Sequence, residues 1–367
     1  MDEAGYGPNL GPLVVAATAW EVEDEGSGLA NQGDCGLRIA DCGFRSQGNG
    51  RQSAIRNPKS EIDSPRYDLH RSLRRVVAKR PSTRRIAIAD SKVLYHPGHG
   101  LRQLERGVHA VLLAMRQSPS CWSEIVKYCQ ADPDSHHLRA CWPEGFDCCL
   151  PIDASADEIA QLGARFQRAC DAAAVRPLAI RARLVFPAQF NDLVADYGSK
   201  GAALSHITVG LLREITDALH AGRFRNPDAL TPPSAFPPPP SIHAVCDKHG
   251  GRSYYTALLQ HHFSEHWIEP IYETRAESRY EWGPPDARVS VAFRVEGERF
   301  LPTALASMTA KYLRELAMRA FNEYWCALVP GLRSTAGYPN DAHRFRNDIA
   351  AAQRELGIDD RALWRNR

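Results

Sequence analysis

The segment at residues 10–20 (LGPLVVAATAW) constrains the fold most strongly because almost every position in it is apolar. It follows a Gly- and Pro-rich stretch and is rich in β-branched residues, which predicts a mostly buried strand. The same patterns predict further strands at 84–89, 178–186, 242–246, 267–272 and 288–295, and helices at 101–115, 202–219, 252–263, 300–328 and 341–356. Because strands and helices alternate, we expect an α/β architecture in which helices cover a sheet.

Three stretches break this pattern. Residues 21–66 are polar and rich in Gly and Ser, residues 117–150 show no clear period, and residues 221–241 contain a Pro-rich run. Such composition is typical of loops and insertions rather than of a packed core. We therefore expect a single domain over residues 1–367 that carries flexible insertions at these three places.

Composition limits the classes of function. The formal net charge is +2, which excludes a globally basic protein that coats DNA. A nucleic-acid partner would have to bind a local basic face. One group of basic residues forms either such a face or a solubilising surface, and it comprises Arg71, Arg74, Arg75, Lys79, Arg80, Arg84 and Arg85.

The sequence carries few signals for membrane insertion, for secretion or for metal binding by cysteine. The chain has no apolar run of about 18 residues, and no basic segment followed by an apolar one opens it. Its ten cysteines form no CxxC pair, so a zinc site held by cysteine is not predicted. We expect a cytoplasmic protein with reduced thiols that binds no membrane.

Two acidic segments adjoin predicted strands. Asp2 and Glu3 precede the apolar run and are followed by Gly-Tyr-Gly-Pro. A charged N-terminal tail with a Gly-rich turn would explain the same residues. Asp247 ends the strand at 242–246, and Lys248, His249, two glycines and Arg252 follow it. This pattern suits a site for a metal and a phosphate, or an Asp that caps a helix.

The predicted helix at 300–328 carries a third acid. Ser307, Lys311 and Glu315 are spaced i, i+4 and i+8, so they share one side of the helix. Taken alone, this spacing favours a solvated face with a Lys–Glu pair worth ~0.3 kcal/mol. Taken together, however, four acids from three segments would repel one another, and a hard divalent cation is the usual remedy. The combination suggests two-metal phosphodiester hydrolysis.

Five segments resemble, in order, the motifs of type 2 ribonucleases H. DEAGYGPNLGPLVVAA resembles that family's opening DEAGRGPLAGPVVAAA, and IADSK at 88–92 resembles its DSK motif. AVCDKHGG is similar to the strand that carries the family's third acid. ALASMTAKYLRE at 304–315 resembles AAASIxAKVxRD, and TAGYPNDAH at 335–343 resembles GYGTKEH. The resemblance spans nearly the whole chain outside the insertions.

The resemblance implies an RNase H-like fold, with a central mixed sheet flanked by helices, in a monomer. It implies cleavage of the RNA strand of RNA–DNA hybrids, or of duplex DNA containing ribonucleotides, by two Mg²⁺ or Mn²⁺ ions, which leaves 3′-hydroxyl and 5′-phosphate ends. Asp2, Glu3, Asp247 and Glu315 would be the catalytic metal ligands, with Asp2 bridging both ions. The residues expected to contact the substrate are Gly5, Tyr6, Gly7, Ser91, Lys92, Lys248, Arg252, Ser307, Lys311 and Tyr338.

The chain departs from the family at several of these positions. Tyr6 replaces an Arg and so lacks that residue's charge and most of its hydrogen-bond donors, which puts recognition of a single embedded ribonucleotide in question. Glu315 replaces an Asp, and Lys248 begins a run that we interpret as extra phosphate contacts. Only Met1 precedes Asp2, where the family has several strand residues. We therefore expect that hydrogen bonds of a strand ladder cannot hold Asp2. We also expect that the α-amino group competes with the metals for the carboxylates. A chain shortened in this way would bind Mg²⁺ weakly.

Two other functions remain open from the sequence. The chain could be a homologue that binds nucleic acid without cleaving it, because of its short N-terminus or Glu315. It could also be a different metal-dependent nuclease that acts on structured DNA. Cleavage assays with RNA–DNA, DNA–DNA and RNA–RNA duplexes would separate these alternatives.

Overall fold

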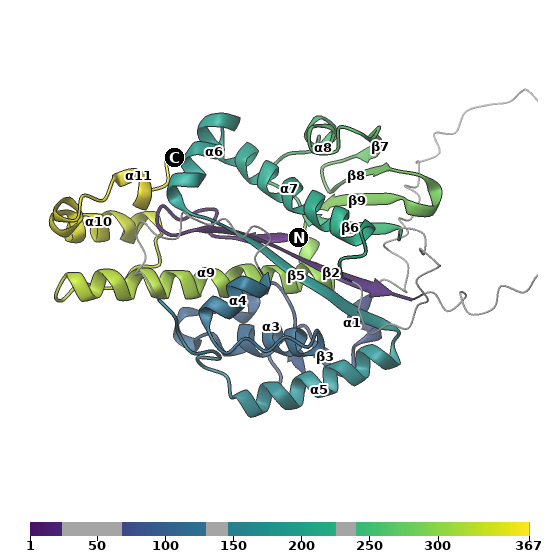
Figure 1. Cartoon of the computed structure of the whole chain (residues 1–367), viewed down its shortest axis with the longest axis horizontal. Helices are drawn as coiled ribbons and strands as arrows, with labels where there is room; N and C mark the ends of the chain where they lie inside the picture. Colours follow the sequence, from purple (N-terminus) through teal and green to yellow (C-terminus); the bar gives the residue numbers. More distant parts are fainter. Residues whose placement is uncertain (24–67, 130–145, 225–239, 367) are drawn as a thin grey trace, which may run out of the picture.

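The computed structural model describes residues 1–23, 68–129, 146–224 and 240–366. This part of the chain is a mixed α/β structure (Figure 1). The predicted insertions at 21–66 and 221–241 lie mostly outside the described residues, as does the middle of the one at 117–150, so the predicted flexibility of these parts stays a prediction. Within the described residues, no helix is both long and apolar enough to cross a bilayer.

Two sheets form the centre of the molecule. One has the order β1-β2-β5 and is antiparallel. The other has the order β6-β9-β8-β7, in which β6 and β9 are parallel and the remaining pairs antiparallel. The strands are β1 (Asp2–Ala4), β2 (Leu13–Val22), β5 (Val175–Val185), β6 (Ile242–Asp247), β7 (Glu269–Glu273), β8 (Glu277–Trp282) and β9 (Val289–Arg294), and a separate parallel pair is β3 (Val77–Ala78) with β4 (Ile86–Ala87).

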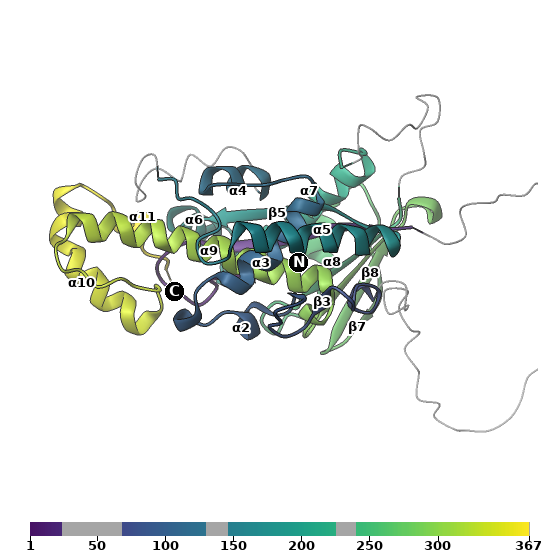
Figure 2. The ribbon, with the colours of Figure 1, turned by 90° about the horizontal axis from the view of Figure 1, so that it is seen from below.

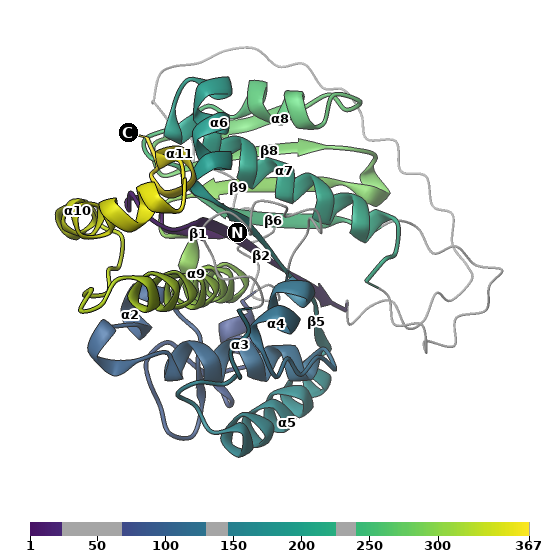
Figure 3. The same ribbon diagram turned by 60° about the vertical axis from the view of Figure 1, so that its left-hand side comes forward.

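Met1 connects the two sheets. Its ammonium nitrogen donates to the Val245 carbonyl oxygen at 2.6 Å, and its own carbonyl accepts from the Asp247 amide at 3.1 Å. These two bonds follow the pattern of a parallel strand pair. They place β1 beside β6, and Figure 3 shows β1 between β2 and β6.

Apolar side chains of β2 face two separate cores, which explains why its sequence is apolar throughout. Val14 and Ala16 pack in one core with α9 (Leu301–Leu328), whereas Leu13 and Val15 pack in the other. Figure 1 shows α9 on one side of β2 and β5 and α7 (Lys200–His220) on the other. Figure 2 shows α3 (Arg102–Ala114) and α5 (Ala156–Ala172) on the side of α9, and both α5 and α9 contact α3.

The remaining helices complete the two layers. α6 (Pro187–Tyr197) and α8 (Thr256–His262) both contact α7. The buried side chains of α10 (Pro339–Glu355) belong to the same hydrophobic core as those of α9. Short helices lie at α1 (Leu69–Ser72), α2 (Ser91–Leu94), α4 (Trp122–Cys129) and α11 (Asp360–Leu363), and single 3-10 turns at η3 (Pro97–His99), η5 (Pro285–Ala287) and η6 (Gly297–Arg299).

The sequence patterns predicted β2, α3, α7, α9 and α10, but they missed the helices α5 and α6 and several short or charged elements. The interpretation of 117–150 as an insertion without period was wrong over α4, whose Trp122, Ile125, Val126 and Cys129 are buried at helical spacing. β8 was missed because Arg279 and Glu281 make its sequence look polar. These two residues form an ion pair at 2.6 Å, which allows a charged strand to lie inside the sheet.

The buried carboxylate of Glu105, on α3, links α3 to the backbone at 152–154 and to α9. Its side chain is fully buried and accepts from the backbone amides of Ile152, Asp153 and Ala154 at 2.6–2.8 Å. It also accepts from the Tyr312 hydroxyl on α9 at 3.3 Å. Three backbone amides therefore depend on this side chain, whereas the Tyr312 hydroxyl also contacts His109 Nε2 at 3.1 Å.

We predict that Glu105→Ala lowers the free energy of unfolding by about 3 kcal/mol or more, because buried donors lose their partner. Chemical denaturation measures the change. Glu323→Ala, which removes an exposed i,i+4 ion pair on α9, should cost less than about 1 kcal/mol. Equal losses in the two variants would contradict this role of Glu105.

Candidate metal centre at the junction of the two sheets

The β1–β2 ladder positions Asp2. Asp2 lies opposite Ala16 and Glu3 opposite Val15 in the antiparallel register. The expectation that one preceding residue leaves Asp2 unsupported was therefore wrong. β2 supplies the ladder on one side, and Met1 is held by β6 on the other. As a result, Asp2 is only 7% exposed.

Asp247 and Glu298 approach each other because β6 and β9 run parallel. Asp247 is the last residue of β6 and lies opposite Arg294 at the end of β9. The chain then turns, and the Gly297 amide donates to Asp247 Oδ1 at 3.1 Å. A Cβ on Gly297 would lie 3.3 Å from the Asp247 Cα, so glycine permits this close approach. Glu298 follows directly.

Asp2, Asp247 and Glu298 form one acidic group. Each offers a carboxylate oxygen, and these oxygens lie within 4.8 Å of one another. Burial raises the pKa of Asp2 well above its usual range, and Glu3, Asp247 and Glu298 raise it further, while a hydrogen bond from Ser307 lowers it. Burial likewise raises the pKa of Asp247 and of Glu298. The sequence predicted no role for Glu298, although Glu298 too follows a predicted strand.

Glu3 lies beside this group without belonging to the close trio. Burial is the main cause that raises the pKa of Glu3 to about 7, and the negative charges of Asp247 and Glu298 add to it. The Met1 ammonium lowers the pKa of both Glu3 and Asp247. The predicted competition between this ammonium and a metal stays a prediction.

Lys92 is a cation that faces the acids from outside. Its side chain is exposed, and its pKa is raised first by Asp90 and then by Glu298, Asp2 and Asp247. The preceding Ser91 is buried, and its backbone amide and hydroxyl both contact the Ser307 hydroxyl, at 3.3 and 3.1 Å. The structure therefore brings Ser91, Lys92 and Ser307 close to the acids, and their predicted contacts with a substrate stay predictions.

Glu315 does not join the acidic group, so the expectation that it gathers there as a fourth acid was wrong. Eight helical residues separate it from Ser307, which is about 12 Å along the axis of α9. Glu315 instead accepts from Tyr95 at 2.7 Å and from Lys311 at 2.5 Å. Lys311 also lies over the Tyr95 ring at 4.3 Å. The Lys311 charge is neutralised there, and its predicted phosphate contact stays a prediction.

The turn at 5–7 and the segment at 336–338 share one support, the buried guanidinium of Arg314. Gly5 has a φ of +87°, and a Cβ there would lie 2.5 Å from Arg314 Nε. Arg314 also donates to the Ala336 carbonyl at 3.0 Å and lies 5.9 Å from the Tyr338 ring centroid. Tyr6 and Tyr338 are 37% and 50% exposed, so both rings are available to a ligand.

The run after Asp247 turns partly away from the acids. Lys248 Nζ donates to the Thr274 carbonyl at 2.6 Å and to the Ser278 hydroxyl at 3.0 Å, which directs it toward β8. Arg252 lies over the Tyr255 ring at 5.9 Å. The structure thus gives Lys248 a local structural role, and the predicted phosphate contacts of Lys248 and Arg252 are not tested by it.

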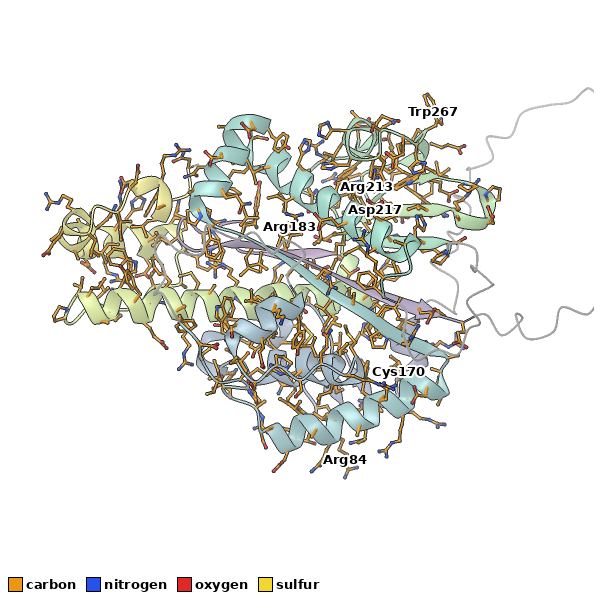
Figure 4. All side chains as sticks on the ribbon, viewed as in Figure 1. Arg84, Cys170, Arg183, Arg213, Asp217 and Trp267 are labelled. Atoms are coloured by element: carbon orange, nitrogen blue, oxygen red, sulfur yellow. The ribbon has the colours of Figure 1, made fainter. Side chains whose placement is uncertain are left out.

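Arg84 marks the position of the basic stretch noted in the sequence. Figure 4 places it at the edge of the molecule near α5, on the opposite side from Trp267. Its neighbour Arg85 donates to the Arg74 carbonyl at 3.3 Å. This contact does not decide between a solubilising surface and a nucleic-acid-binding face.

The arrangement suits a hard divalent cation. Several carboxylates that are buried together repel one another. Burial raises the pKa values of Asp2, Glu3 and Asp247, and neighbouring carboxylates add to the rise at Asp2 and Glu3. Carboxylate oxygens are the ligands that Mg²⁺ and Mn²⁺ prefer. The donor set therefore fits such an ion chemically.

We predict that Glu3 destabilises the metal-free fold increasingly as the pH rises from about 4.5 to 8. Its folded-state pKa of about 7 lies above the ordinary value of 4.5, so the folded chain holds a proton that the unfolded chain has lost. Deprotonation therefore favours unfolding over this interval. The Tm of Glu3→Gln should rise relative to that of the unchanged protein as the pH increases.

Thermal unfolding of both proteins at several pH values measures this difference. Buried histidines such as His109, whose pKa is lowered to about 4, contribute an opposite slope to both proteins and cancel in the comparison. The difference should shrink under saturating Mg²⁺, and Glu323→Gln should show none. A Tm difference that does not change with pH would contradict the electrostatic account.

Comparisons with known proteins find no family model, no curated protein and no solved structure that matches this chain. The functional inference therefore rests on the residues and geometry described above.

Proposed function

We propose that the chain is a metal-dependent endoribonuclease that hydrolyses the RNA strand of RNA–DNA hybrids and leaves 3′-hydroxyl and 5′-phosphate ends. The observation that carries the proposal is the meeting of Asp2, Asp247 and Glu298. These acids come from separate segments of the chain, and their oxygens lie within 4.8 Å. Two of them lie in segments that resemble type 2 ribonuclease H motifs.

The architecture supports the same proposal. A mixed sheet flanked by helices is what the resemblance implies, and the described residues have this general arrangement (Figure 3). We propose that it is an RNase H-like fold. The acids lie where β1 meets the carboxyl ends of β6 and β9, which is the edge at which α/β sheets often bind ligands.

Asp2, Asp247 and Glu298, with Glu3 beside them, are the residues that would hold the cations. Bound Mg²⁺ or Mn²⁺ would supply an activated water and neutralise charge on the phosphate. Lys92 faces the same acids from the solvent side, so its ammonium can bind the substrate phosphate. Ser307 holds Asp2 by a hydrogen bond and thus orients that carboxylate.

Exposed backbone and rings of the N- and C-terminal segments would contact the nucleotides. The turn at Gly5 and Gly7 leaves backbone close to the surface, and a Cβ on Gly7 would meet no atom within 4 Å. A backbone that is open in this way can approach a ribose and its 2′-hydroxyl, which distinguishes RNA from DNA. Tyr338 offers a ring on which a neighbouring nucleotide can pack.

One observation favours a second function, in which the chain binds hybrids without cleaving them. The Met1 ammonium lies near Glu3 and Asp247 and lowers the pKa of both carboxyls. It competes with a divalent cation for the same carboxylates, which would weaken cation binding. Binding of a hybrid without cleavage at high Mn²⁺ would support this function.

We predict that the purified protein, with Mg²⁺ or Mn²⁺, cleaves a labelled RNA–DNA hybrid and leaves an all-DNA duplex intact. A third duplex with one embedded ribonucleotide tests whether Tyr6 replaces the family's Arg. Cleavage of the all-DNA duplex would indicate a different nuclease. Lack of cleavage in every reaction would contradict the proposed function.

We predict further that Glu298→Gln lowers hybrid cleavage by about 100-fold or more, as expected when a catalytic electrostatic group is removed. Glu315→Gln should lower it by less than about tenfold, because Glu315 lies outside the acidic group. Glu296→Gln is the matched control, since Glu296 is exposed and two residues away. Larger loss in Glu315→Gln than in Glu298→Gln would contradict the assignment.

A further inference from the structure

A group of three histidines lies on the α7 side of the sheet, in a part of the molecule that the proposed function does not use. His206 is on α7, and His261 and His262 end α8. One ring nitrogen from each lies within 4.8 Å of the others. The three ring centroids are 5.1–5.2 Å apart in every pairing.

Neighbouring residues hold this group in place. The Tyr197 ring stacks on His206, with centroids 3.7 Å apart and planes 4° apart, which fixes the His206 ring plane. Arg213 donates to the His262 carbonyl at 2.9 Å and to Asp217 at 2.7 Å, so it ties α7 to the end of α8. Figure 4 shows Arg213 and Asp217 together on α7, below Trp267.

We propose that His206, His261 and His262 bind one divalent transition-metal ion of the zinc class. His206 Nδ1 and His262 Nε2 are 3.2 Å apart, and without a metal one ring donates to the other. Two nitrogens bound to tetrahedral zinc at about 2.0–2.1 Å are separated by about 3.3–3.4 Å, so this pair is already spaced for a shared ion. His261 is exposed, and its ring can turn toward the same point.

The ligand chemistry distinguishes this site from the acidic one. Neutral imidazole suits zinc, copper, cobalt and nickel, whereas carboxylate oxygen suits magnesium and manganese. Burial is the main cause that lowers the pKa of His262 to about 4, and burial also lowers the pKa of His206. Both rings are therefore neutral near pH 7, which is the form that binds metals.

A metal at this point would join α7 to α8 and restrain the chain close to the acids. Ser205, next to His206, contacts His249 Nδ1 at 3.0 Å, and His249 follows Asp247 by two residues. Three histidines leave a fourth tetrahedral position for water or another ligand. The bound ion would thus restrain the layer that supports β6.

Titration of the metal-free protein with Co²⁺ tests the proposal, because tetrahedral Co²⁺ absorbs visible light. We expect one equivalent to bind with this absorption and without a sulfur-to-cobalt band, and Zn²⁺ to displace it and raise Tm. His206→Gln and His262→Gln should each weaken binding at least tenfold. His261→Gln, which changes an exposed ring, should do the same without a change in fold by circular dichroism.

Two controls separate this site from others. His343→Gln, which changes an exposed histidine on α10, should bind Co²⁺ as the unchanged protein does. Asp247→Asn removes an acid of the other centre and should also leave this binding unchanged, so failure of the nuclease proposal would not affect the result. Absence of the Co²⁺ absorption, or full binding in any one of the three histidine variants at the site, would overturn the proposal.

Discussion

Two backbone hydrogen bonds of Met1 to β6 determine how the two sheets meet. They place the first residues of the chain beside residues 245–247. Because β1 also pairs with β2, a single residue bridges the ladder of one sheet to the ladder of the other. Asp2 and Asp247 come together for this reason, and their proximity needs no direct contact between the two side chains.

The electrostatics of the centre follow from that geometry. Burial raises the pKa values of Asp2, Glu3 and Asp247, and neighbouring carboxylates raise those of Asp2 and Glu3 further, so the metal-free fold carries an unfavourable charge arrangement at neutral pH. A protein retains such an arrangement where function requires it, and here a divalent cation would relieve it. Lys92 and the Met1 ammonium relieve part of it in the metal-free protein.

The sequence predicts what depends on local pattern. β2 and α9 were identified because their apolar positions repeat over many residues, and Asp247 because it ends a clear strand. Glu298 was missed because its place depends on β6 and β9 lying parallel and adjacent, and that pairing joins residues about fifty positions apart. The histidine group was missed for the same reason, since it joins α7 to α8.

The prediction that Glu315 joins the other acids was wrong for a different reason. The i, i+4, i+8 spacing correctly put Ser307, Lys311 and Glu315 on one side of α9, and Lys311 and Glu315 do form an ion pair. Residues on one side of a helix are nevertheless spread along its axis, and the eight positions from Ser307 to Glu315 span about 12 Å. Ser307 reaches Asp2, whereas Glu315 reaches Tyr95. Sharing a helix face therefore did not imply sharing a site.

The most direct test of the central claim is anomalous X-ray scattering from crystals of the protein grown with Mn²⁺. We expect a manganese peak bounded by the carboxylates of Asp2, Asp247 and Glu298, and none beside Glu315. A peak at Glu315, or no peak at the acidic group under saturating Mn²⁺, would contradict it.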